Sequence, residues 1–143
     1  MGKISFFSED VAMPVLDYGK AERWIESVVA SHGKSAGDLT YCFCSDLHIL
    51  KVNREFLDHD YFTDIITFDY SRGKRVSGDM VISLDTVKSN SELFGTDERR
   101  ELLRVIIHGV LHLCGINDKG PGEREIMESH ENAALSMAES YEI

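Results

Sequence analysis

Residues 96–118 read TDERRELLRVIIHGVLHLCGIND, a stretch that combines a helical pattern with metal-ligating side chains. Thr96 is predicted to cap a helix, because its hydroxyl can accept a hydrogen bond from a backbone N–H of the first turn. The acidic residues that follow it complement the positive end of the helix dipole. The helix is predicted to run to about Cys114 and to end at Gly115, since glycine readily adopts the left-handed conformation that closes many helices.

Two histidines and one aspartate in this stretch have the spacing of a metal site. His108 and His112 lie four residues apart, so a helix presents both imidazoles on one face, one turn apart. Asp118 follows three residues after the glycine that ends the helix, which allows it to turn back towards the same ion. Two imidazoles and one carboxylate suit zinc with an open position for water. We therefore predict a metal-dependent hydrolase with one Zn²⁺ per chain.

The residue after the first histidine bears on the reaction. Metallopeptidases of the H-E-x-x-H type place a glutamate there as general base, whereas this chain has Gly109. We expect Gly109 to open space beside the metal for a bulky substrate. The missing base favours hydrolysis of a phosphodiester, and it disfavours the alternative of a metal-dependent peptidase or amidase.

Length and composition indicate one globular domain, residues 1–143. The net charge of −10 argues against broad non-specific binding to nucleic acids, because phosphate contacts need Lys and Arg. No apolar run approaches the roughly 20 residues that span a bilayer, so we expect no membrane association. Cys42 and Cys44, one residue apart, are interpreted as small buried side chains, and reduced thiols fit a cytoplasmic protein.

The flanking sequence alternates between strand and helix patterns. Strands are predicted at residues 4–7, 38–45, 63–68 and 78–84, and further helices at residues 17–30, 46–57, 85–94 and 123–139. A polar turn at residues 71–76 predicts a hairpin-like connection between the last two strands. The order predicts an α+β fold, in which a small mixed four-stranded β-sheet packs with about five helices and the metal-site helix lies in the C-terminal half.

Three motifs carry a resemblance to a known family: TDIITF at residues 63–68, GDMVIS at 78–83 and HGVLHLCG at 108–115. Together they resemble the YbeY family of bacterial metal-dependent endoribonucleases, over roughly residues 53–131. The resemblance implies a zinc-dependent, single-strand-specific cut in RNA, maturation of the 3′ end of small-subunit (16S) ribosomal RNA, and ribosome quality control. It implies a ribosomal RNA precursor and the small subunit or its assembly proteins as partners.

Three positions depart from the family pattern: Asp118, Leu57 and Arg104, the last of which stands one turn before the first ligand, where many relatives have a polar residue or histidine. The third ligand of the family is usually histidine, and the matching residue here is Asp118. A carboxylate adds negative charge, which should make the metal a weaker Lewis acid. Leu57 stands where the family carries an arginine, so that arginine's role cannot be transferred; Arg54 could substitute, since residues three apart share a helix face. Leu57 also keeps open the alternative of a ribosome-assembly factor with a structural or weakly active metal site.

Arg104 is the other candidate for a catalytic role. It precedes His108 by four residues, so it should lie on the metal face of the helix, where it could contact a phosphate. An ion pair with Glu98 or Glu101 is the alternative interpretation.

Overall fold

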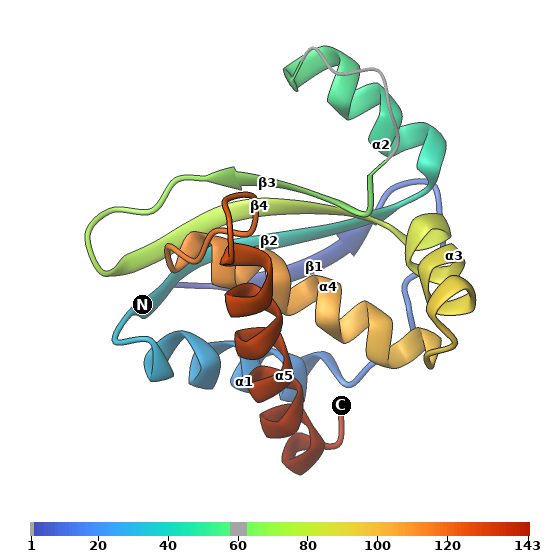
Figure 1. Cartoon of the computed structure of the whole chain (residues 1–143). Coiled ribbons are helices and arrows are strands. Elements are labelled where there is room, and N and C mark those ends of the chain that lie inside the picture. Colours follow the sequence, from blue (N-terminus) through green and yellow to red (C-terminus); the bar gives the residue numbers. More distant parts are fainter. Residues whose placement is uncertain (1, 58–62) are drawn as a thin grey trace.

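A four-stranded sheet forms the centre of the computed structural model, which describes residues 2–57 and 63–143 (Figure 1). The strands are β1 (Ile4–Ser8), β2 (Ser35–Cys44), β3 (Ile65–Asp69) and β4 (Arg75–Ser83), in the spatial order β1-β2-β4-β3. The pairs β1–β2 and β2–β4 are parallel, whereas β3 pairs with β4 in the antiparallel direction. The predicted small mixed sheet and its hairpin are confirmed, and β3 forms one edge.

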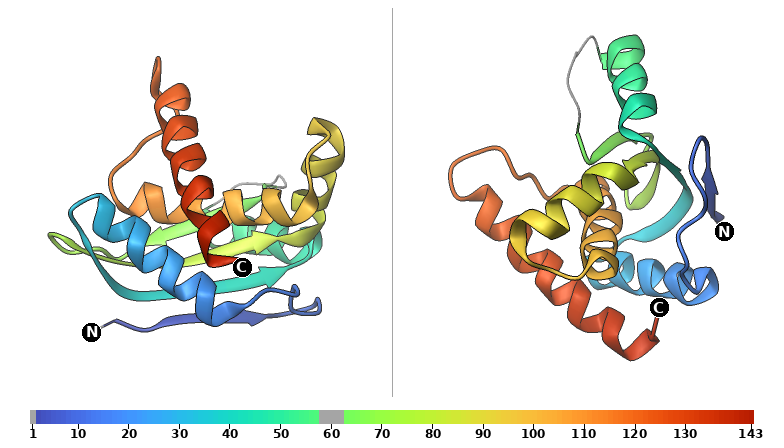
Figure 2. Two further views of the ribbon diagram at one scale, coloured as in Figure 1. Left: turned by 90° about the horizontal axis from the view of Figure 1, so that it is seen from below. Right: turned by 90° about the vertical axis from the view of Figure 1, so that its right-hand side faces the viewer.

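In the described part of the chain, five α-helices and a short π-helix pack around the sheet. They are α1 (Tyr18–Ser31), α2 (Asp46–Val52), the π-helix η1 (Asn53–Leu57), α3 (Leu84–Phe94), α4 (Glu98–Leu113) and α5 (Glu123–Tyr141). Helices α1, α4 and α5 lie on one face of the sheet, as Figure 2 shows, and share its main apolar core. On the opposite face, Ile49 of α2 packs with Cys44 and Ile66 in a smaller core. The α+β architecture is therefore as predicted. Within the described ranges, no helix combines the length and apolar character needed to cross a membrane.

Helix α4 begins one residue later than predicted. Asp97, not Thr96, takes the extended backbone of an N-cap, and its carboxylate accepts a hydrogen bond from the backbone N–H of Arg100 at 3.2 Å. A carboxylate at this position caps the first turn and also carries the negative charge that the helix dipole favours. Asp97 therefore both caps the helix and complements its dipole, whereas the sequence predicted Thr96 as the cap and the acidic residues after it as the partners of the dipole.

Gly109 faces the sheet, so the expectation that it opens space beside the metal is wrong. It is buried in α4, and a Cβ at this position would lie 2.8 Å from Met80 Cγ and 2.9 Å from Ile65 Cδ1. Such distances are shorter than real Cβ contacts allow, so a side chain here would force the side chains of Met80 and Ile65, or the helix itself, to shift. The absence of a side chain at Gly109 lets α4 pack closely against β3 and β4, and this packing positions the two histidines of α4 relative to the sheet.

The cysteine interpretation is confirmed. Cys42 and Cys44 are free thiols on β2 and are 7% and 0% exposed, respectively. Burial raises their pKa values to about 11 and about 12. Both residues behave as small apolar side chains of the sheet.

Candidate metal centre

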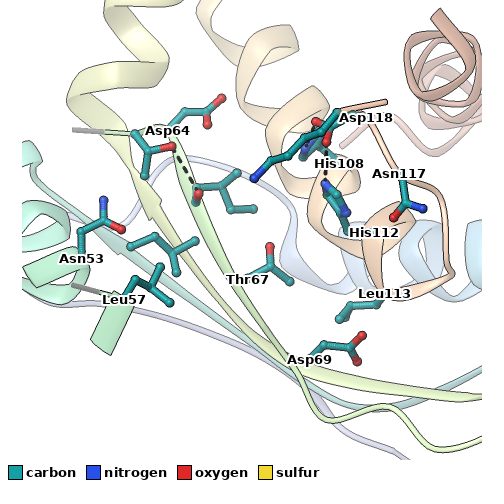
Figure 3. Close-up of a pocket in the computed structure, with 14 residues that line it drawn as sticks. Asn53, Leu57, Asp64, Thr67, Asp69, His108, His112, Leu113, Asn117 and Asp118 are labelled. Atoms are coloured by element: carbon teal, nitrogen blue, oxygen red, sulfur yellow. Dashed lines mark hydrogen bonds and ion pairs between the residues drawn. The ribbon is translucent and has the colours of Figure 1, made fainter. Parts of the chain in front are cut away.

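The structure brings His108, His112 and Asp118 together at the C-terminal end of α4 (Figure 3). His108 Nε2 lies 3.4 Å from Asp118 Oδ2, and His112 Nε2 lies 3.2 Å from Asp118 Oδ1. One ligand atom from each residue lies within 4.8 Å of the other two, an arrangement that could hold a metal ion. The sequence had singled out the same three side chains.

The end of α4 determines where Asp118 lies. Gly115 has a φ of +97°, in the region that favours glycine. Its N–H donates to the carbonyl of His112 at 3.0 Å, and the N–H of Ile116 donates to the carbonyl of Leu111 at 3.1 Å. This pair of bonds is the Schellman motif, which ends a helix and turns the chain back across its last turn. The turn brings Asp118 over the two histidines.

The chemistry and spacing of these donor atoms fit a cation with tetrahedral coordination. Bonds of about 2.0–2.1 Å to zinc place tetrahedral ligand atoms roughly 3.4 Å apart, close to the two observed separations. Asp118 Oδ1 is buried, and among the described residues its nearest polar contact is His112 Nε2 at 3.2 Å, which is not counted as a hydrogen bond. A buried carboxylate oxygen without a partner is costly, and a cation would satisfy it.

Glu131 of α5 orients the first histidine. Its Oε2 lies 2.6 Å from His108 Nδ1, and the residue is 7% exposed. An ionised carboxylate only accepts hydrogen bonds, so Nδ1 donates its proton to Glu131, which leaves Nε2 as the nitrogen whose lone pair a metal ion would take up. Glu131 was not among the residues predicted from the sequence. Its position on the apolar face of α5, four residues after Met127 and four before Leu135, is the feature of the sequence that could have indicated a buried carboxylate.

Arg104 pairs with Glu131, not with Glu98 or Glu101. Its guanidinium donates to Glu131 Oε1 at 2.8 Å and to Asn132 Oδ1 at 2.7 Å. Arg104 thus acts through Glu131 on His108, because one carboxylate joins both side chains. Its positive charge is neutralised within the protein and held next to the metal ligands.

The environment shifts the two imidazoles in opposite directions. Burial lowers the pKa of His108, but the hydrogen bond to Glu131 and the nearby carboxylates outweigh it and raise the pKa above its usual value. Burial and the neighbouring His108 lower the pKa of His112. Burial would raise the pKa of Glu131, yet its hydrogen bonds with His108 and Arg104 lower it, which keeps this carboxylate ionised.

A hollow of about 490 Å³, named here the β3 hollow, opens beside the His-His-Asp group. Thr67 and Asp69 of β3 line it, and Asn53 and Leu57 lie across it from the histidines (Figure 3). Leu57, which stands at the family's arginine position, therefore faces the group across the hollow. Lys119 adds a positive charge to the lining.

The structure separates Arg54 from this site. Of the described residues in the η1 segment, Asn53 and Leu57 line the β3 hollow and Arg54, which is exposed, does not. The physical reason is the π-helix, whose i→i+5 bonds widen each turn, so that residues three apart no longer share a face.

Comparison with known proteins identifies the family of the chain. The family model described as Endoribonuclease YbeY matches residues 7–139. A protein named Endoribonuclease YbeY from Parabacteroides distasonis is 58% identical over 134 residues, which cover 94% of each chain. Its namesake from Porphyromonas gingivalis (strain W83) is 48% identical over 137 residues, covering 96% of this chain and 91% of that protein.

Among solved structures, the fold resembles the solution structure of TM1509 from Thermotoga maritima, with a TM-score of 0.67. The two sequences are 22% identical, and the likeness covers 96% of this chain and 90% of the other. At this identity the likeness supports the fold alone. The family model and the full-length relatives show more, namely that the chain belongs to the YbeY family.

Proposed function

We propose that this chain is a zinc-dependent endoribonuclease that cuts single-stranded RNA, built as one metallohydrolase domain over residues 1–143. His108, His112 and Asp118 are the proposed zinc ligands. The observation that carries the proposal is the His-His-Asp group itself, which opens on a hollow in a member of a family named for endoribonuclease activity. By the same family membership, the proposed substrate is a precursor of 16S ribosomal RNA, cut at its 3′ end.

The residues around the group divide the work of the site. Zinc, when bound, supplies a Lewis acid for a phosphoryl oxygen and lowers the pKa of a water molecule. Glu131 keeps the proton of His108 on Nδ1, and Arg104 holds Glu131 in position. Lys119 offers a positive charge to a phosphate in the β3 hollow. Arg104 is therefore a positioning residue in this scheme.

Partner proteins help to explain how an acidic chain finds RNA. With a net charge of −10, the chain as a whole repels phosphate, so general electrostatic attraction cannot supply the affinity. We propose that docking on the small ribosomal subunit or its assembly proteins, in the cytoplasm, delivers the RNA. A role in ribosome quality control follows from the same proposal.

Two other functions are less well supported. A peptidase of the H-E-x-x-H type would need a glutamate at Gly109, where even a Cβ would come within 3 Å of the Met80 and Ile65 side chains. A structural zinc site normally has four protein ligands. Among the residues that the structure describes, the group has three, and it faces a hollow instead of packed side chains.

The test is cleavage of a labelled single-stranded RNA by the zinc-loaded protein, with and without chelator. We expect internal cuts that stop on chelation and return when zinc is added back. His112→Ala should lose both zinc and cleavage, whereas the matched control His130→Ala, on α5 outside the group, should keep both.

Two results would contradict the proposal. Intact RNA after incubation with fully metallated protein would support the assembly-factor alternative. Wild-type zinc content in His112→Ala would exclude the proposed ligand set. A peptide panel run in parallel checks the peptidase alternative.

A further inference from the structure

A second hollow, of about 480 Å³, lies on the other side of the His-His-Asp group. We name it the α5 hollow; it is lined by Phe94, Thr96, Glu101, Arg104, Arg124 and Glu128, among others. It shares Asp64, His108 and Asp118 with the β3 hollow. An enzyme that cuts inside a strand needs room for the substrate on both sides of the reacting bond, and the two hollows provide that room.

Phe94 is a large apolar side chain left in solvent beside this site. It is the last residue of α3 and is 63% exposed. Gly95 follows with a φ of +65° and ends α3, so Phe94 lies where the chain turns towards α4. Of the described residues that line either hollow, Phe94 is the only phenylalanine, tyrosine or tryptophan. An exposed aromatic ring that lines a hollow suits the stacking of a nucleobase.

The charges of the α5 hollow favour a base over a phosphate in its interior. Glu101 and Glu128 add carboxylates to the lining, and Arg104 is already paired with Glu131. Carboxylates repel phosphate, but they accept hydrogen bonds from the N–H groups of bases. An uncharged ring with N–H donors therefore matches this lining better than the backbone of RNA does.

Arg124 provides the contact for the backbone. It is exposed at the start of α5, it lines the α5 hollow, and within the described part of the chain it forms no ion pair. Lys119 lines the β3 hollow on the opposite side of Asp118. Lys119 and Arg124 thus line the hollows on either side of the His-His-Asp group.

We propose that the α5 hollow is a nucleobase subsite, in which Phe94 stacks a base next to the bond that is cut and Arg124 binds a neighbouring phosphate. The inference rests on the proposed endoribonuclease function and adds the residues that hold the RNA on one side of the metal.

Binding of a short single-stranded RNA to the zinc-loaded protein tests the subsite. The RNA carries 2′-O-methyl groups and phosphorothioate linkages, so that it keeps its charges and resists hydrolysis, and affinity is measured by fluorescence anisotropy. Phe94→Leu should weaken binding about 10-fold, the order expected for the loss of one base stack. Phe94→Tyr, which keeps an aromatic ring, should bind with wild-type affinity. Leu93→Ala is the matched control, since Leu93 is 75% exposed on the same helix but does not line the hollow.

Salt dependence separates the role of Arg124 from that of Phe94. Arg124→Gln should reduce the slope of log affinity against log salt by about 0.7, the value for one phosphate contact with a single strand. Phe94→Leu should leave this slope unchanged. Arg99→Gln, which removes an exposed arginine outside both hollows, should behave as wild type.

A 2-aminopurine base moved along the RNA reports stacking directly. We expect quenching at one position, and loss of that quenching in Phe94→Leu. If the wild type binds and cuts RNA but Phe94→Leu binds within twofold of it, the subsite is refuted and the proposed function stands. If the wild type neither binds nor cuts RNA, both proposals are wrong.

Discussion

Replacement of Glu131 by glutamine tests how the fold prepares its metal ligands. Glu131 holds His108 at 2.6 Å and Arg104 at 2.8 Å, and it is 7% exposed. The glutamine side chain has nearly the same shape, but it is uncharged and turns an N–H towards one of its two donor partners. Loss of such a carboxylate behind a ligating histidine typically weakens metal binding 10- to 100-fold, or about 1.4–2.8 kcal/mol. We expect zinc affinity to fall in this range.

Two effects of the substitution oppose each other, and the conditions can separate them. Glu131 raises the pKa of His108, so its removal reduces competition from protons and favours the metal. The substitution also removes the carboxylate that orients the ring. The same carboxylate makes Nε2 more basic, so its loss weakens the bond to the metal. At about pH 8.5 proton competition is small, so the second effect should dominate. Competition with a chromophoric zinc chelator measures the affinity, and NMR titration of the metal-free protein should show a lower pKa for His108.

The controls define what would refute this reasoning. Glu125→Gln removes an exposed carboxylate from α5 outside the site and should keep wild-type affinity. Arg104→Gln leaves the bond between Glu131 and His108 in place and should weaken zinc binding less than Glu131→Gln does. Zinc affinity within twofold of wild type in Glu131→Gln would show that this carboxylate does not prepare His108 for a metal.

Other predictions concern the fold. Asp97→Ala should lower the free energy of unfolding by about 1 kcal/mol in urea titrations, because it removes the N-cap of α4, and an equal loss in Thr96→Ala would contradict this assignment. Gly109→Val should cost about 2 kcal/mol in the same assay, because its side chain would meet Met80 and Ile65; unchanged stability would show that α4 can move away freely. Cys42 and Cys44 should resist alkylation in the native protein at neutral pH, since pKa values of about 11 and 12 leave on the order of one thiolate in ten thousand or fewer, and rapid labelling by mass spectrometry would refute the burial.

The sequence predicted those parts of the molecule that depend on short-range pattern. The i, i+4 spacing of His108 and His112, followed by a helix-ending glycine, is local, and the structure brings the three residues together as expected. The strands and helices followed from periodicity in the same way. Their ends moved by a few residues, as with the N-cap of α4, because neighbouring polar residues can each serve as a cap.

What the sequence could not predict depends on contacts between distant elements. Glu131 reaches His108 from another helix, and a pattern on α5 alone does not identify which residue it meets. The expectation for Gly109 was wrong because spacing shows that a residue is small, but not whether its open side faces the ligand or the sheet. Arg54 was predicted to take the place of the family arginine because residues three apart share a face of an α-helix. The chain forms a π-helix there, so this prediction failed for a reason that the local sequence does not show.

The compactness of the ligand set has a consequence for folding. All three proposed ligands lie within residues 108–118, so an unfolded chain can also chelate zinc with this segment. Zinc then stabilises the native state by less than its affinity for the folded protein suggests, since only the difference between the two affinities counts. Glu131, 23 residues further along the chain than His108, is absent from any such local complex. Its contact with His108 therefore adds to the preference of the metal for the native state over the unfolded chain.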